Sequence, residues 1–165
     1  MTVHVFAQSL TEGQRIERVL DVYFERWFIL EPVDLTTEKR DGIDRIAIHR
    51  RSRKKLRLEY KKDGAAASTG NLFLETESNG NPSWAYTCRA DYLVIAIPGL
   101  NAGFIFRPGT IRANIDGWKG HYGICEPWTE GWYETYASLG VCVPVRIMRT
   151  FAVTSLYLPA RVEAN

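Results

Sequence analysis

Hydrophobic positions along the chain follow two different periods. In residues 11–28 they recur every three or four residues, which is the period of an amphipathic helix. Thr11 can cap the start of this helix, with Gln14 three residues later as its capping-box partner. We therefore expect a first helix over residues 11–28, with an apolar stripe made of Ile16, Val19, Leu20, Tyr23 and Trp27.

Later segments show the alternation and the continuous apolar runs that are typical of strands. Residues 43–49 and 56–62 flank a basic turn centred near Ser52 and Arg53, so they predict a hairpin. Residues 90–98 are nearly all apolar, which predicts a central strand buried on both faces. Further strands are expected at residues 71–76, 141–148 and 151–158, a helix at residues 110–118, a loop at residues 63–70 and irregular structure at residues 120–140. This mixture predicts an α/β or α+β layered domain.

The composition fits one globular domain spanning residues 1–165. The chain has 45% hydrophobic and 24% charged residues, far from the composition of a disordered protein. No apolar run approaches the roughly 20 residues that cross a bilayer, and the first ten residues lack the pattern of a secretion signal. The three cysteines, Cys88, Cys125 and Cys142, are too widely spaced for a disulfide framework. We expect free thiols, no membrane association and a cytoplasmic location.

Positive charge is concentrated in one segment, although the net charge is only +2. Residues 50–62 contain eight basic residues and the single acid Glu59. Such a block is often a solvated face, but Leu56, Leu58 and Tyr60 alternate through it as in a strand. The turn at its start is therefore expected to bind the phosphates of nucleic acid through Arg50, Arg51, Arg53, Lys54 and Lys55.

Two acids and a lysine in the predicted hairpin form a candidate catalytic site. Glu59 and Lys61 are two residues apart and so share one face of their strand. A turn at the predicted position places Asp44 opposite Tyr60 or Lys61. Two adjacent carboxylates suit Mg²⁺, and a lysine beside them can activate water or counter charge in the transition state. The alternative is an ordinary set of cross-strand salt bridges on a solvent-facing surface.

A wider pattern surrounds these residues. In chain order it consists of residues 13–18 with Glu17, residues 41–46 with Asp44, residues 58–61 with Glu59 and Lys61, residues 69–75, Trp84 and residues 90–92. In this order and spacing the chain resembles the PD-(D/E)XK nuclease superfamily, the restriction-endonuclease and Holliday-junction-resolvase-like fold. The resemblance covers about residues 10–98 and implies a restriction-endonuclease-like core, a mixed central β-sheet flanked by helices. Residues 99–165 would be an elaboration of that core.

The resemblance also implies roles for individual residues. Asp44 and Glu59 would be the ligands of Mg²⁺ or Mn²⁺, and Lys61 would be the catalytic lysine. Glu17 would be an accessory acid on the first helix. Asp41 is the alternative first metal ligand, although the triplet that ends in Asp44 opens the strand and favours Asp44.

Two functions follow from this pattern. The first is a metal-dependent nuclease, expected to be an endonuclease acting on DNA, in which water attacks in line and leaves a 5′-phosphate and a 3′-hydroxyl. The second is a non-catalytic nucleic-acid-binding protein that keeps the fold and grips phosphates with residues 50–57. Glu75, in the next predicted strand, is either a further acid of the site or the polar side of that strand. The oligomeric state is left open, a homodimer included.

Overall fold

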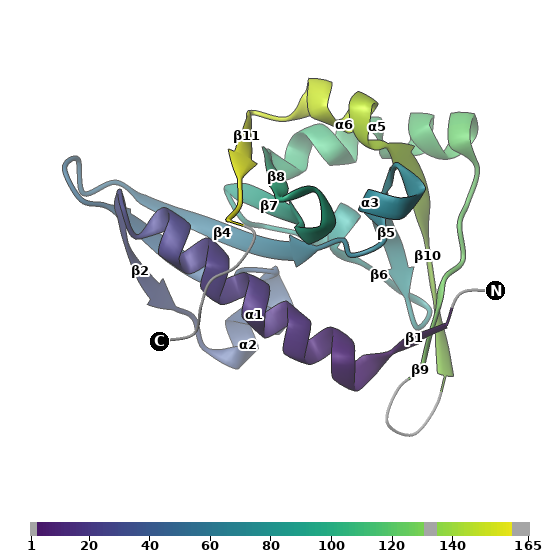
Figure 1. The fold of residues 1–165 in the computed structure, drawn as a ribbon, viewed down its shortest axis with the longest axis horizontal. Helices are drawn as coiled ribbons and strands as arrows, with labels where there is room; N and C mark the ends of the chain where they lie inside the picture. The colour runs from purple at the N-terminus through teal and green to yellow at the C-terminus, as the bar shows by residue number, and fades with distance from the viewer. Residues whose placement is uncertain (1–2, 131–134, 160–165) are drawn as a thin grey trace.

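The computed structural model describes residues 3–130 and 135–159, and within them the centre of the fold is a six-stranded sheet. In spatial order its strands are β11 (Thr154–Tyr157), β8 (Ala102–Phe106), β7 (Tyr92–Ile97), β4 (Lys55–Lys62), β3 (Arg45–His49) and β2 (Phe28–Pro32). β4 and β7 run parallel, and the other neighbouring pairs are antiparallel. The helices that flank it make an α+β fold with a mixed sheet, as predicted (Figure 1).

Part of a second sheet, β5 (Asn71–Ser78) and β6 (Asn81–Pro82), lies in the connection between β4 and β7, and strands from the N-terminal and C-terminal parts of the chain complete it. Among the described residues it has five strands: β1 (Val3–Val5), β9 (Trp128–Glu130), β10 (Thr135–Pro144), β5 and β6. The pairing of β5 with β10 is its longest ladder. Leu72 and Leu74 on β5 are buried together with Val141 and Val143 on β10, so this sheet presents one apolar face to the core.

Helix α1 (Phe6–Phe24) crosses one face of the six-stranded sheet (Figure 1). Its buried side chains Val19, Leu20 and Phe24 form one cluster with Leu58 and Tyr60 of β4. The remaining helices are α2 (Leu35–Asp41), α3 (Ala66–Thr69), α4 (Trp84–Thr87), α5 (Pro108–Tyr122), α6 (Val145–Phe151) and the 3₁₀ helix η1 (Pro98–Leu100). In the part of the chain that the structure describes, no helix combines the length and the apolar character needed to cross a bilayer.

The opposite face of the six-stranded sheet is covered by α4, α5 and the second sheet. Leu93 and Ile95 of β7 pack there against Ile111 and Ile115 of α5 and Ala85 of α4. Because Val94 and Ala96 of the same strand belong to the α1 cluster instead, β7 is buried on both faces, as predicted.

The predicted helices are both confirmed, with different bounds. The first helix begins at Phe6 and ends at Phe24, so Trp27 lies beyond it and 46% of its surface is exposed. The helix predicted at residues 110–118 runs over Pro108–Tyr122 and buries the expected apolar face.

Three predictions for irregular or extended segments were wrong. Residues 145–151 form helix α6 rather than parts of two strands. Pro144 has no N–H for a ladder, so β10 ends there, and the helix that follows buries Met148. The expected loop at residues 63–70 contains helix α3, and the expected irregular stretch at residues 120–140 contains β9 and the start of β10. Residues 131–134 of that stretch lie outside the described part of the chain.

Candidate functional site

The register of the β3–β4 hairpin brings the two predicted metal ligands directly opposite each other. Arg45 pairs with Leu58, and continuing this register by one residue places Asp44 opposite Glu59. The prediction had placed Asp44 opposite Tyr60 or Lys61, and it was wrong because the turn is shorter. His49 N donates to Lys54 O (2.9 Å), and the chain reverses through Arg53 in a left-handed conformation (φ 59°).

Asp44 is held rigidly at the start of β3. Its backbone N–H donates to Leu58 O (2.8 Å), and its Oδ2 accepts a hydrogen bond from Tyr60 N (2.6 Å). Only 9% of Asp44 is exposed. The ladder therefore fixes this carboxylate beside β4 at the position of Glu59.

Glu59 is a buried carboxylate with an incomplete set of partners. Its exposed fraction is 3%, and its Oε1 accepts a hydrogen bond from Lys61 Nζ. Its Oε2 has no hydrogen-bond partner among the described residues. Burial raises the pKa of Glu59 to about 7; the Asp44 carboxylate also raises it, while the Lys61 ammonium opposes both.

Lys61 remains a cation in this setting. Burial lowers the pKa of Lys61, but the Glu59 charge and hydrogen bond outweigh it, and the pKa is raised overall. One third of its side chain (33%) is exposed, so the ammonium lies at the edge of the site, within reach of solvent. Glu59 and Lys61 pair in register with Leu93 and Ile95 of β7, which places them on the sheet face that is covered by α4 and α5.

The floor of the site comes from segments that are distant in sequence. Gly42 has a left-handed backbone (φ 59°), and a side chain there would contact the Glu59 carboxyl group at 3.8 Å. Cys88, at the end of α4, donates from Sγ to Gly42 O (3.8 Å), and Arg112 of α5 donates to Cys88 O (2.7 Å). Burial raises the pKa of Cys88 to about 11, so it is a neutral thiol at physiological pH. Gly42 lay within the predicted motif, whereas nothing in the sequence pointed to Cys88 or Arg112.

Glu17 lies on the opposite face of the hairpin from Glu59. Its Oε2 accepts a hydrogen bond from Arg45 (3.2 Å), which also donates to Asp21 on the same helix (3.0 Å). The Arg45 guanidinium lies 5.8 Å from the centre of the Tyr60 ring, on the face of β4 that α1 covers. The sheet therefore separates Glu17 from Glu59, and the structure does not bring the predicted accessory acid to the predicted metal ligands.

The two alternative acids are engaged elsewhere. Asp41 accepts hydrogen bonds from Arg40, whose guanidinium lowers the pKa of Asp41, and it has a second, longer ion pair with Arg89 (3.7 Å). Glu75 accepts hydrogen bonds from the hydroxyl groups of Ser83 and Ser138. Asp44 is among the main groups that raise the pKa of Glu59, and Asp41 and Glu75 are not. The geometry thus favours Asp44 over Asp41 as the partner of Glu59.

The side chains that gather at the site fit a small, hard cation held by few protein ligands. Asp44 and Glu59 offer carboxylate oxygens, of which Glu59 Oε2 is buried and unpaired. Within the described residues no group of three or more His, Cys, Asp or Glu side chains is placed to hold a metal. Mg²⁺ is commonly bound through one or two carboxylates and keeps several waters, so this pair satisfies its minimum requirement.

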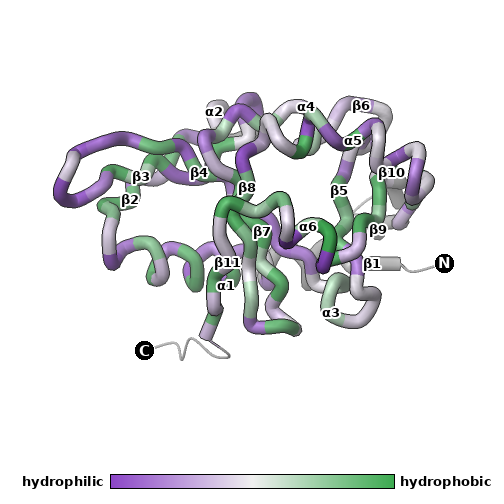
Figure 2. The backbone as a smooth tube through the Cα atoms, turned by 90° about the horizontal axis from the view of Figure 1, so that it is seen from above, coloured by the Kyte–Doolittle hydropathy of each residue, from purple (hydrophilic) through white to green (hydrophobic). Residues whose placement is uncertain are grey.

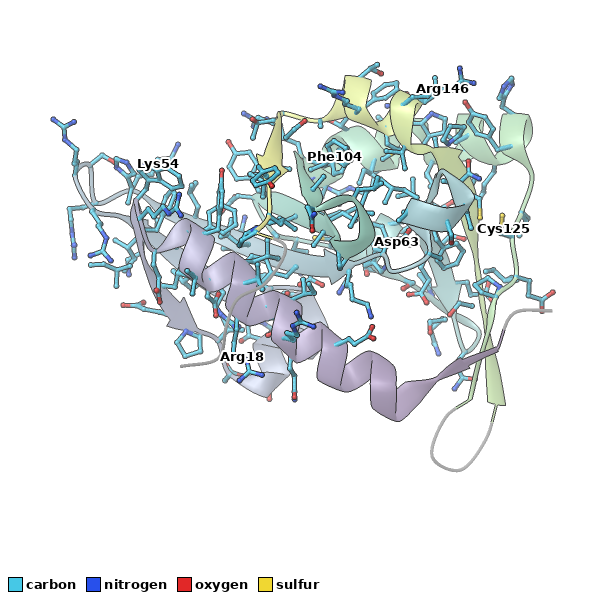
Figure 3. The ribbon with its side chains drawn as sticks, viewed as in Figure 1. Arg18, Lys54, Asp63, Phe104, Cys125 and Arg146 are labelled. Atoms are coloured by element: carbon cyan, nitrogen blue, oxygen red, sulfur yellow. The ribbon has the colours of Figure 1, made fainter. Side chains whose placement is uncertain are left out.

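The five predicted phosphate-binding residues lie at the exposed end of the same hairpin. The loop between β3 and β4 projects from the body of the protein, and it is hydrophilic along its outer part (Figures 1 and 2). Figure 3 shows Lys54 near this end. Arg50 is partly anchored, because its N–H donates to Trp27 O (2.9 Å) and its Nε donates to Glu25 O (3.0 Å). At about 3.3 Å per residue, Lys55 lies about 13 Å along β4 from Glu59.

No protein-family model, curated protein or solved structure matches this chain. A function is therefore inferred from the residues and their geometry alone. Two features of the hairpin are relevant. A buried acidic pair with a lysine lies near one end, and a set of solvent-exposed cations lies at the other.

Proposed function

We propose that this protein is a divalent-metal-dependent nuclease of the PD-(D/E)XK type, an endonuclease that hydrolyses phosphodiester bonds in DNA. The observation that carries the proposal is the Glu59 carboxylate, buried beside Asp44 and Lys61 with one oxygen unpaired. A strongly perturbed carboxylate next to a second acid and a cation is more typical of a functional site than of a structural ion pair.

In the proposed mechanism Asp44 and Glu59 would hold Mg²⁺ or Mn²⁺. The metal, when bound, would neutralise charge on the scissile phosphate and lower the pKa of a water molecule. Lys61 is charged and partly accessible, so its ammonium can orient the attacking water or counter the charge that develops on the phosphate. Asp44 stays in place during these steps because its second contact is the backbone of Tyr60.

The exposed cations of the hairpin would bind DNA by neutralising backbone phosphates. Their distance from Glu59, about 13 Å at Lys55, corresponds to about four base pairs along a duplex. A single duplex can therefore contact the hairpin and the acidic site together. The three cysteines are free thiols, which suits the cytoplasm that we propose as the location.

One observation favours the rival function of a non-catalytic DNA-binding protein. The Lys61 ammonium already occupies Glu59 Oε1, and the described residues supply no third acid at the site. A phosphate-binding hairpin needs neither a metal nor a catalytic lysine.

The deciding experiment is a cleavage assay on supercoiled plasmid, single-stranded DNA and a four-way junction. Each substrate is incubated with Mg²⁺, with Mn²⁺ or with a chelator, and Glu59→Gln protein serves as the matched inactive control. Metal-dependent products with 5′-phosphate ends, absent for the variant, support the nuclease. Retained DNA binding without cleavage of any substrate under either metal supports the rival.

A further inference from the structure

A separate cavity of about 230 Å³ opens on the α1 face of the six-stranded sheet. It lies just beyond the ends of the two parallel strands, because Lys62 is the last residue of β4 and Pro98 follows the last residue of β7. In open α/β sheets ligands bind outside the carboxyl ends of parallel strands, and the parallel pair of this sheet, β4 and β7, presents such an end here. Lys62 alternates with Lys61 along β4, so this cavity and the Glu59 site lie on opposite faces.

The mouth of the cavity carries two cations and one acid. Arg15 and Lys62 supply the positive charge, and Glu12 supplies the negative charge. Glu12 forms an ion pair with Lys62, which lowers the pKa of Glu12. Arg15 is exposed, and no hydrogen bond or ion pair of its side chain is found among the described residues; its charge, like that of Lys62, lowers the pKa of Glu12, and its guanidinium can still approach an anion. The cavity therefore has a net positive charge.

The wall behind these charges is apolar. Ile16 and Val19 of α1 face the cavity, together with Leu158 from the segment after β11. Leu158 is fixed there, because its N–H donates to Asn101 O (2.8 Å). A ligand with an anionic group at one end and a ring that can contact these apolar side chains at the other matches this arrangement. The volume lies just below the roughly 300 Å³ at which pockets for drug-sized ligands begin, and so suits a smaller molecule.

We propose that this cavity binds a nucleoside monophosphate, with its phosphate between Arg15 and Lys62 and its base or sugar against Ile16, Val19 and Leu158. The ligand is either a free nucleotide or the 5′-phosphorylated end of a nucleic acid, because both present the same chemistry. Glu12 competes with the phosphate for Lys62. The proposal does not depend on cleavage, since no residue of the Asp44–Glu59 site lines the cavity.

The test is calorimetric titration in the presence of a chelator, so that the result is independent of any metal-dependent cleavage. The probes are thymidine 5′-monophosphate, thymidine, inorganic phosphate and a short 5′-phosphorylated oligonucleotide with its unphosphorylated counterpart. The monophosphate should bind more tightly than both thymidine and phosphate if the cations and the apolar wall act together. Preference for the phosphorylated oligonucleotide over the free nucleotide would identify the polymer end as the source.

Variants locate the binding. Arg15→Gln should lower the affinity for the monophosphate by about tenfold or more, as expected for a lost charge-assisted hydrogen bond. Glu12→Gln should raise this affinity by about threefold, because Lys62 is then released from its ion pair with Glu12. Arg18→Gln, on the same helix but outside the cavity lining, is the matched control and should change nothing (Figure 3). Absence of binding to every phosphorylated probe, or equal effects of Arg15→Gln and Arg18→Gln, would overturn the proposal.

Discussion

The two faces of the β3–β4 hairpin differ in how their charged side chains are paired. On the α1 face, Arg45 donates hydrogen bonds to both Glu17 and Asp21. On the other face, Lys61 donates to Glu59 alone, and Asp44 lies close enough to raise the pKa of Glu59 further. On the α1 face both carboxylates accept hydrogen bonds from one guanidinium, and the oxygen left buried and unpaired among the described residues is the neutral hydroxyl of Tyr60; on the other face it is a carboxylate oxygen of Glu59.

The difference follows from the chemistry of the two cations. The planar guanidinium of Arg45 has five N–H donors and can serve two acids at once. The ammonium of Lys61 is a compact charge that leaves Glu59 Oε2 without a partner among the described residues. The buried and unpaired carboxylate oxygen of Glu59 costs folding free energy, and such a cost is expected where a side chain serves a function rather than stability.

The largest effects should come from removing Asp44 or Lys61. If Lys61 stabilises charge in the transition state, Lys61→Ala should lower the cleavage rate by about 10²–10³-fold. The affinity for Mn²⁺, measured by calorimetry, should change little because the lysine is not a ligand. Asp44→Ala should abolish cleavage and also weaken Mn²⁺ binding.

Asp21→Asn supplies the matched change on the α1 face. It alters a carboxylate that also lies beside the hairpin, yet on the side of α1, so the cleavage rate should stay within about threefold of the wild-type rate while thermal unfolding shifts downward. A comparable loss of cleavage for Asp21→Asn and Lys61→Ala would remove the functional distinction between the faces.

The next effect concerns the pH dependence of stability. The pKa of Glu59 is raised from 4.5 to about 7 in the folded protein, so the folded state binds the proton more tightly than the unfolded state. The unfolding free energy should therefore fall by up to about 3 kcal/mol as pH rises from about 4.5 to about 7, and then level off. Lys61 does not titrate in this window, because its pKa is raised above its ordinary value.

Urea unfolding at several pH values measures this component, and Glu59→Gln is the control because it cannot ionise. Between pH 4.5 and 7 the unfolding free energy should fall less steeply with pH in Glu59→Gln than in the wild type. Equal slopes for the two proteins would mean that Glu59 is not the group responsible.

A third effect concerns the salt dependence of DNA binding by the exposed end of the hairpin. Arg51, Lys54 and Lys55 are exposed, whereas Arg50 is anchored and Arg53 has a special backbone conformation. Replacing the first three by Gln should reduce the slope of log affinity against log salt by about 2–3 units if each contacts a duplex phosphate. Arg146→Gln with Arg149→Gln, on α6, is the control and should leave the slope unchanged (Figure 3).

Local patterns were sufficient to predict the acidic pair and its lysine. Strand alternation alone places Glu59 and Lys61 on one face, and a short hairpin necessarily brings Asp44 close to them. The exact register was missed because it depends on Arg53, a non-glycine residue in a left-handed conformation that no sequence pattern indicated.

The rest of the site depends on contacts between distant segments. The contacts of Cys88 with Gly42 and of Arg112 with Cys88 exist only because α4 and α5 pack over the sheet. The sheet face on which α1 lies is likewise a property of tertiary packing. The helical period of a segment does not indicate which face of a sheet the helix will cover. The sheet face beside Glu17 could therefore not be predicted from the sequence.

Glu17 gives the smallest expected effect and the sharpest test of the two-face comparison. If Glu17 is an accessory acid, as the sequence resemblance implied, Glu17→Ala should slow cleavage measurably. Its contact with Arg45 on the α1 face instead predicts a cleavage rate within about threefold of the wild type and a loss of stability below about 1 kcal/mol, since Asp21 still binds Arg45. Single-turnover cleavage and thermal unfolding of the same protein separate the two outcomes. A clear loss of rate with unchanged unfolding would mean that Glu17 reaches the Glu59 site when DNA is bound.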